Sequence, residues 1–282
     1  MVISTREWGL PGGAQGAERL HVRAWAPAQG EPDRLVVLVH GYGEHVGRYD
    51  YPAGFLCTRG AVCYGLDHRG HGRSSGERVL VEDIDGLVED VHRVVTQARS
   101  AYRSLPLVLV GHSLGGLIAA RYVQTHPEQV AGLVLSAPVL GRWTAVEELL
   151  EAAEIPDAPI DPATLSREES VGADYTADEL VWHGPFKRRT LEAIRAGLAD
   201  ASAAGRVRDI PLLWLHGSAD ALVPLEGTLQ GVLSLAGPDT SARVFPGARH
   251  EVFNETNRDE VLAEVARFAG RVAPARGGTP AG

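Results

Sequence analysis

The chain has 282 residues, of which 44% are hydrophobic and 22% are charged, and its formal net charge is -9. The length suits one large α/β domain with an insertion or two small domains, and the composition is ordinary for a globular protein. The acidic balance argues against a nucleic-acid partner and against attraction to anionic membrane surfaces.

The N-terminal stretch MVISTREWGLPGG has neither the basic start nor the apolar run of a signal peptide. No apolar stretch approaches the roughly 18 residues that span a bilayer. We therefore expect a cytoplasmic protein. Cys57 and Cys63 fall in an expected helix end and in the strand after it, so we interpret them as core residues rather than a disulfide or a metal pair.

Short apolar runs, each closed by a turn signal, recur along the chain. They lack alternation, which is typical of strands buried on both faces of a parallel sheet. Ahead of them, residues 19–26 alternate between apolar and polar and predict an antiparallel strand at the edge of that sheet. The runs that predict parallel strands are 35–39, 62–66, 107–110, 132–136 and 212–215.

Segments with apolar residues at helical spacing separate these runs, at 83–102, 114–125 and 254–272. Strands that alternate with helices predict a mostly parallel, doubly wound α/β sheet with right-handed crossovers.

The alternation of strands and helices breaks between 140 and 206. Helices expected over 143–153 and 189–204 flank the irregular stretch EIPDAPIDP. We expect this segment to be a small helical cap inserted after the sixth strand. The expected organisation is a core over 1–139 and 207–272, the cap over 140–206, and a disordered tail over 273–282 in which no residue is large enough to pack.

A serine lies between glycines where an expected strand meets an expected helix. Gly111-His112-Ser113-Leu114-Gly115 fits the G-x-S-x-G turn that exposes a nucleophilic serine above a sheet. Such a turn would place the Ser113 hydroxyl at a helix N-terminus, where developing negative charge is favoured. The same letters also occur in simple packing turns, so the prediction depends on partners elsewhere.

A serine nucleophile needs a base and an acid that orients the base, and in this strand–turn–helix context they follow in the order Ser, Asp, His. Asp220 comes just after an expected strand, as in other sites at the carboxyl ends of α/β strands. His250 follows one more strand and precedes the last helix. Taken alone, each could be an ordinary surface residue. Their order favours a catalytic triad of Ser113, Asp220 and His250.

An acyl-transfer reaction also needs two hydrogen-bond donors for the oxyanion. One expected donor is the backbone N–H of Leu114. The other is the backbone N–H of Tyr42, in the glycine-containing loop after the first parallel strand.

Five motifs together resemble the monoacylglycerol lipases of the α/β-hydrolase superfamily, particularly actinobacterial members. They are HGYGEHVGRY, LDHRGHGRSSG, GHSLGG, HGSAD and the final Ala-Arg-His-Glu. The resemblance covers about 35–139 and 210–268 and reaches into the cap. It implies an α/β-hydrolase fold and supports the same triad and oxyanion donors.

The resemblance also implies that Glu44 and Arg48 shape the polar end of the site near the glycerol and that Tyr175 on the cap faces the site. Glu44 and Arg48 fit a structural ion pair equally well. The mammalian enzymes carry a histidine three residues past the catalytic one, and Phe253 takes that position here.

The leading hypothesis is a serine ester hydrolase that cleaves monoacylglycerols to glycerol and a fatty acid through an acyl-enzyme. A general carboxylesterase or lysophospholipase is the alternative, and a non-catalytic ligand-binding protein on the same fold is a third. We expect no cofactor and no metal, because the loop histidines have no carboxylate or cysteine at ligand spacing. Apolar residues of the cap suggest contact with micelles or the periphery of a membrane.

Overall fold

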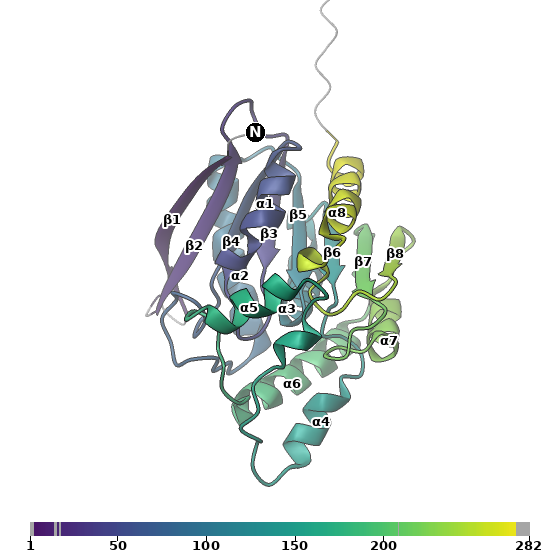
Figure 1. Ribbon diagram of the computed structural model, residues 1–282. Coiled ribbons are helices and arrows are strands. Elements are labelled where there is room, and N and C mark those ends of the chain that lie inside the picture. The colour runs from purple at the N-terminus through teal and green to yellow at the C-terminus, as the bar shows by residue number, and fades with distance from the viewer. Residues whose placement is uncertain (1–2, 14–15, 17, 208, 275–282) are drawn as a thin grey trace, which may run out of the picture.

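The computed structural model describes residues 3–13, 16, 18–207 and 209–274. Within them, eight strands form one sheet in the order β1-β2-β4-β3-β5-β6-β7-β8 (Figure 1). The pairs β1–β2 and β2–β4 are antiparallel, and the others are parallel. The strands are β1 (Ile3–Gly12), β2 (Glu18–Pro27), β3 (Arg34–Val39), β4 (Ala61–Leu66), β5 (Leu107–His112), β6 (Gly132–Ser136), β7 (Leu212–Gly217) and β8 (Thr240–Phe245).

The position expected for the antiparallel strand was wrong. Residues 19–26 do form most of β2, but β2 lies between β1 and β4, and β1 occupies the edge. The two strands pair over their whole length, from Ile3 opposite Pro27 to Gly12 opposite Glu18. Much of β1 is exposed, so its sequence carries no apolar stripe that would have marked it as a strand.

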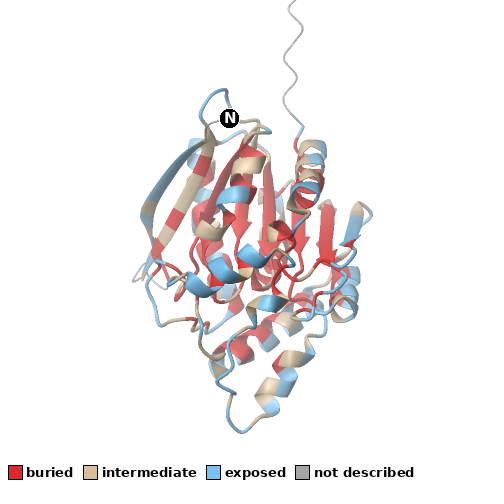
Figure 2. Ribbon diagram, viewed as in Figure 1, coloured by how far each residue is buried: buried red, intermediate tan, exposed pale blue. Residues whose placement is uncertain are grey.

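The central strands are buried on both faces, as their unbroken apolar runs predict (Figure 2). Along β3, Leu35 and Val37 pack into one apolar cluster with α2 and α3, whereas Val36 and Leu38 pack into another with α1 and α8. Each such fully buried side chain contributes about 1.5–3 kcal/mol to folding. The flanking helices are α1 (Asp50–Cys57), α2 (Ile84–Ala101), α3 (Leu114–Thr125), α7 (Leu225–Leu235) and α8 (Arg258–Val272).

Of the three helices expected outside 140–206, two match the structure within a residue at each end, and one does not. Helix α2 begins after Asp83, whose carboxylate caps it, and α3 has the predicted bounds. Helix α8 begins four residues later than expected, because the short 3-10 turn Val252–Asn254 comes first. Cys57 and Cys63 are buried free thiols. The tail expected over 273–282 lies outside the described residues from 275 onward, whereas Ala273 packs in the core, contrary to prediction.

The chain between β6 and β7 is helical and lies past the carboxyl ends of the parallel strands (Figure 1). It contains α4 (Thr144–Glu151), α5 (Glu169–Ala177) and α6 (Arg188–Ala204). The first and last match the helices expected at either side of the irregular stretch, whereas α5 was not expected. Among the described residues, no helix is both long enough and apolar enough for a bilayer span.

Candidate active site

Ser113 forms the sharp turn between β5 and α3. Its φ of 54° and ψ of -121° place a non-glycine residue in a strained backbone region. Backbone hydrogen bonds hold this conformation. The Ser113 N–H donates to the Ser136 carbonyl at 3.0 Å, and the Ser113 carbonyl accepts from the Gly116 and Val139 N–H groups, both at 2.9 Å. The neighbouring strand and the loop after it therefore fix the direction of the serine.

The glycines on either side of Ser113 are required by close backbone approach. A Cβ at Gly115 would lie 2.1 Å from the Val39 carbonyl oxygen, and one at Gly111 would lie 2.3 Å from the Gly115 carbonyl oxygen. Both distances are far inside van der Waals contact, so the strand and the helix meet only because these positions lack side chains.

Asp220 and His250 lie in the loops after β7 and β8 and are hydrogen bonded to each other. The Asp220 Oδ2 is 2.8 Å from the His250 Nδ1, so the carboxylate accepts and the ring carries its proton on Nδ1. The Asp220 Oδ1 accepts from the Leu222 and Val223 N–H groups, both at 2.9 Å. His250 and Ser113 line the same cavity. The structure thus brings the three predicted residues to one end of the sheet.

The charges around His250 favour a base that gains a proton readily. Burial alone would lower the pKa of His250, but the carboxylate of Asp220, with those of Glu251 and Glu44 farther off, holds it above its ordinary value. Burial would raise the pKa of Asp220, but the charge of His250 and the hydrogen bonds lower it well below its usual range. The neighbouring ring of His112 has a pKa of about 3, because it is buried and faces His250.

The two backbone N–H groups expected to bind an oxyanion belong to segments beside Ser113. Leu114 is the first residue of α3, and first-turn N–H groups have no acceptor within their helix. Tyr42 and Gly41 line the cavity from the loop after β3. A Cβ at Gly41 would be 3.1 Å from the Ser113 Cβ, so this loop passes directly beside the serine. The Tyr42 ring stacks on Phe186, with ring centroids 4.3 Å apart.

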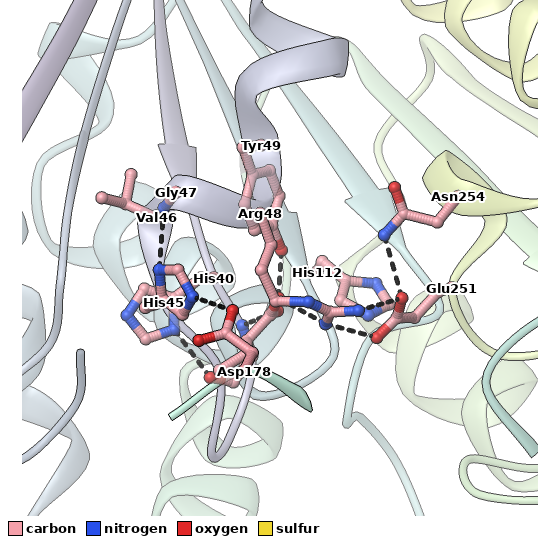
Figure 3. Close-up of polar contacts among 12 residues, drawn as sticks. His40, His45, Val46, Gly47, Arg48, Tyr49, His112, Asp178, Glu251 and Asn254 are labelled. Atoms are coloured by element: carbon pink, nitrogen blue, oxygen red, sulfur yellow. Dashed lines mark hydrogen bonds and ion pairs between the residues drawn. The ribbon is translucent and has the colours of Figure 1, made fainter. Parts of the chain in front are cut away.

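Arg48 lies at the centre of a buried ionic network (Figure 3) whose charged members line the cavity. Its two terminal nitrogens contact the Glu251 carboxylate at 2.6 and 2.8 Å, and one of them also contacts Glu44 at 3.2 Å. The Glu44 Oε1 in turn accepts from the Gly41 N–H at 2.6 Å and from the Tyr49 hydroxyl at 2.9 Å. The expected ion pair between Glu44 and Arg48 is therefore present.

The pKa values of the two carboxylates that contact Arg48 shift in opposite directions. Burial would raise the pKa of Glu251, but the bidentate guanidinium lowers it well below its usual range. Burial instead raises the pKa of Glu44, because its share of the guanidinium is smaller and Glu251 repels it. Tyr175 also lines the cavity, as expected, with its ring 5.2 Å from the Arg48 Cζ.

Three contacts of this region were not predicted from the sequence. Glu251 belongs to the Ala-Arg-His-Glu motif, but its ion pair with Arg48 was not expected. The Asp178 carboxylate, after α5, is 2.7 Å from the His45 Nε2, and the Trp182 N–H donates to the Gly43 carbonyl at 2.7 Å. The contacts of Asp178 and Trp182 join the segment between β6 and β7 to the loop that carries Tyr42.

The cavity between these elements has a volume of about 190 Å³ and a lining of two chemical kinds. Carboxylates, a guanidinium and a phenol make up one group, and aliphatic and aromatic side chains make up the other. The polar lining is Glu44, Arg48, Tyr175 and Glu251, and the apolar lining is Trp143, Ala145, Leu149, Ile160, Leu165, Phe186, Leu222 and Val223.

The other histidines of the loops are packed among themselves. His40 and His68 have ring centroids 4.1 Å apart, and His71 lies against both. Burial lowers the pKa of His68 to about 3 and that of His71 to about 4, so both are neutral near pH 7. In the described part of the chain, no group of three or more His, Cys, Asp or Glu side chains is arranged to hold a metal ion.

Comparison with known proteins gives consistent similarities. The family described as serine aminopeptidase, S33, matches residues 30–257. The monoacylglycerol lipase of Mycolicibacterium smegmatis is 36% identical over 95% of this chain and 98% of that protein. The human monoglyceride lipase is 32% identical over 84% and 81% of the two chains. The crystal structure of the Paleococcus ferrophilus monoacylglycerol lipase superposes with a TM-score of 0.75, at 25% identity, covering 96% of this chain and all of that one.

Proposed function

Because the chain belongs to the monoacylglycerol lipases of the serine aminopeptidase S33 family and has the α/β-hydrolase fold, we propose that it cleaves monoacylglycerols to glycerol and a free fatty acid. The observation that carries the proposal is the cavity itself. Ser113 and His250 line one cavity together with an ionic cluster and many apolar side chains, which is the combination that an ester between a fatty acid and glycerol requires.

In this mechanism the Ser113 hydroxyl attacks the ester carbonyl while His250 takes its proton. The oxyanion accepts hydrogen bonds from the Leu114 and Tyr42 N–H groups. Asp220 holds the imidazole through Nδ1 and stabilises the imidazolium. His250 then protonates the departing glycerol oxygen, and water enters, is deprotonated by His250 and hydrolyses the acyl-enzyme.

Peptide hydrolysis fits the site less well, although the family description names aminopeptidases. An aminopeptidase of this kind needs carboxylates that bind the substrate ammonium. The carboxylates that line the cavity, Glu44 and Glu251, are both engaged by Arg48. A net cationic substrate end would have to displace that guanidinium.

The proposal is tested by fatty-acid release from a panel of esters, with Ser113→Ala as the control. The panel contains monoacylglycerols of several chain lengths, a diacylglycerol, a lysophosphatidylcholine and p-nitrophenyl butyrate. We expect the highest kcat/KM on a monoacylglycerol. Preference for lysophosphatidylcholine would favour a lysophospholipase, and activity on the activated ester alone would favour a general carboxylesterase. If no ester acylates the protein, the remaining hypothesis is a non-catalytic ligand-binding protein.

A further inference from the structure

Glu251 directly follows His250, and its side chain contacts a residue of another loop. Both of its oxygens contact Arg48, and the Asn254 amide donates to its Oε2 at 2.9 Å. Only 5% of the Glu251 side chain and 10% of the Arg48 side chain are exposed. A buried bidentate pair of this kind is directional and costly to break from one side.

The other end of the network reaches the proposed oxyanion site. Arg48 contacts Glu44, and Glu44 accepts from the Gly41 N–H, one residue before Tyr42. The side chains of Glu251, Arg48 and Glu44 therefore form a continuous link from the residue after the base to the loop that supplies an oxyanion donor. Its central contact, between Arg48 and Glu251 (Figure 3), joins residues 203 positions apart in the chain.

We propose that Glu251 is a positioning residue whose ion pair with Arg48 sets the distance between the His250 loop and the Tyr42 loop. Asp220 orients the imidazole from the β7 side, and Glu251 fixes the same loop from the β3 side. Acyl transfer requires the base and the oxyanion donor to be correctly placed around the same ester carbonyl group. Small displacements of such groups lower the reaction rate by large factors. This inference rests on the proposed ester hydrolysis.

Two roles of Glu251 make opposite predictions about which constant changes. A residue that only contacts the glycerol would change KM for monoacylglycerols and leave p-nitrophenyl butyrate untouched, because that ester has no glycerol. A residue that positions the two loops affects kcat for both esters, because both pass through the same tetrahedral intermediate.

The test compares Glu251→Gln and Glu251→Asp with the matched control Asp90→Asn. Asp90 is buried in α2 and pairs with Arg69 at 2.6 Å, outside the cavity lining. We expect Glu251→Gln to lower kcat on p-nitrophenyl butyrate and on a monoacylglycerol by about 10–100-fold, with KM within about threefold. Aspartate keeps the charge but is one methylene shorter, so Glu251→Asp should lose about 3–10-fold, and it carries the test if the glutamine variant does not fold.

A pH profile adds a readout that a purely structural role would not move. The charged and titratable groups around His250 are Asp220, Glu251, Glu44 and His112. Removing the Glu251 charge should shift the acidic limb of kcat/KM to lower pH, whereas Asp90→Asn should leave it in place.

Three results would overturn the inference: a loss confined to KM for the monoacylglycerol, a kcat within twofold of the native value, or a loss no larger than that of Asp90→Asn. The proposed substrate can fail independently. If the native protein hydrolyses p-nitrophenyl butyrate but no monoacylglycerol, the activated ester still measures the positioning effect.

Discussion

The two walls of the cavity are held by different kinds of contact. On the sheet side, Ser113 is fixed by backbone hydrogen bonds to Ser136, Gly116 and Val139, and Asp220 is held by two backbone N–H groups of its own loop. These contacts depend on the path of the main chain, so few side-chain substitutions can displace them.

On the opposite wall, the segment between β6 and β7 contributes Trp143, Ala145 and Phe186 to the apolar lining. It contacts the Tyr42 loop through a backbone hydrogen bond from Trp182, a carboxylate–histidine contact from Asp178 and the stack of Phe186 on Tyr42. The reactive groups therefore depend on main-chain contacts, whereas the apolar lining of this wall consists of side chains, which are easier to alter.

The strongest test of the sheet-side wall is Ser113→Ala. We expect kcat on any ester to fall by about 10⁴-fold or more, because the nucleophile is lost. The backbone contacts of residue 113 remain, so the melting temperature should stay within about 2 °C of the native value. Stopped-flow measurement of p-nitrophenol release checks the rate, and calorimetry checks the melting temperature. A variant that keeps one-tenth of the native rate would mean that another residue is the nucleophile.

Asp220→Asn should come next in size. An amide keeps the shape of the carboxylate but favours the wrong tautomer of His250, so we expect kcat to fall by about 10⁴-fold. Steady-state rates on p-nitrophenyl butyrate measure this loss, with Asp174→Asn on the exposed face of α5 as the control. A loss of less than tenfold would show that Asp220 does not orient the base.

The pH profile of the native protein tests the same pair. His250 acts as a base only when neutral, and its pKa is raised above the ordinary value of about 6.5. The kcat/KM should therefore fall as the pH drops through a value above 6.5, by about tenfold per unit below it. An acidic limb of kcat/KM with its midpoint below pH 6.5 would contradict the electrostatic effect of Asp220.

The sheet side was also the part that the sequence predicted best. Strands such as β3 and β5 contain continuous apolar runs with a glycine within the next two residues, and α2 has both an aspartate cap and a strong helical period. The order of Ser113, Asp220 and His250 follows from the same alternation, because each residue comes just after a strand. For these elements, the local sequence pattern and the position in the fold agree.

The remaining elements could not be predicted because their sequences carry no such pattern. Strand β1 is largely exposed, and α5 buries only Val171 and Tyr175, too few for a helical stripe. The partners of Glu251 and Asp178 are set by contacts between residues more than 130 positions apart. Nothing local in the sequence specifies such pairs.

For the opposite wall, Ala145→Trp should change selectivity rather than chemistry. Ala145 lies on α4 in the apolar lining, and a larger ring there removes room for the distal part of an acyl chain. Each methylene in apolar contact contributes about 0.8 kcal/mol, so displacing about four of them should lower kcat/KM by about 200-fold.

The loss should be confined to long-chain monoacylglycerols, with monobutyrin nearly unaffected. The matched control is Glu148→Trp, which adds the same side chain on an exposed part of α4. An equal loss on both chain lengths would mean that the substitution disturbs Ser113 and that the two walls are not independent.

The smallest expected effect comes from the contact between Asp178 and His45. The side chains are 28% and 10% exposed, so the contact contributes on the order of 0.5–1 kcal/mol. Asp178→Asn keeps an oxygen for the Leu180 N–H, which now donates to the Asp178 Oδ1 at 2.9 Å. We expect kcat/KM to change by no more than about fivefold.

Hydrogen exchange gives the more sensitive measurement, because the Trp182 N–H donates to Gly43 beside the same contact. If the carboxylate helps to hold this wall against the Tyr42 loop, the Trp182 amide should exchange about three- to fivefold faster in Asp178→Asn and at the native rate in Asp174→Asn. Combining the first variant with His45→Gln should not speed the exchange of the Trp182 amide further, since both substitutions remove the Asp178–His45 contact, although His45→Gln also removes the ring nitrogen that accepts from the Gly47 N–H at 3.1 Å. Additive effects on this exchange rate would show that the two side chains act through other partners and that their mutual contact does not hold the wall.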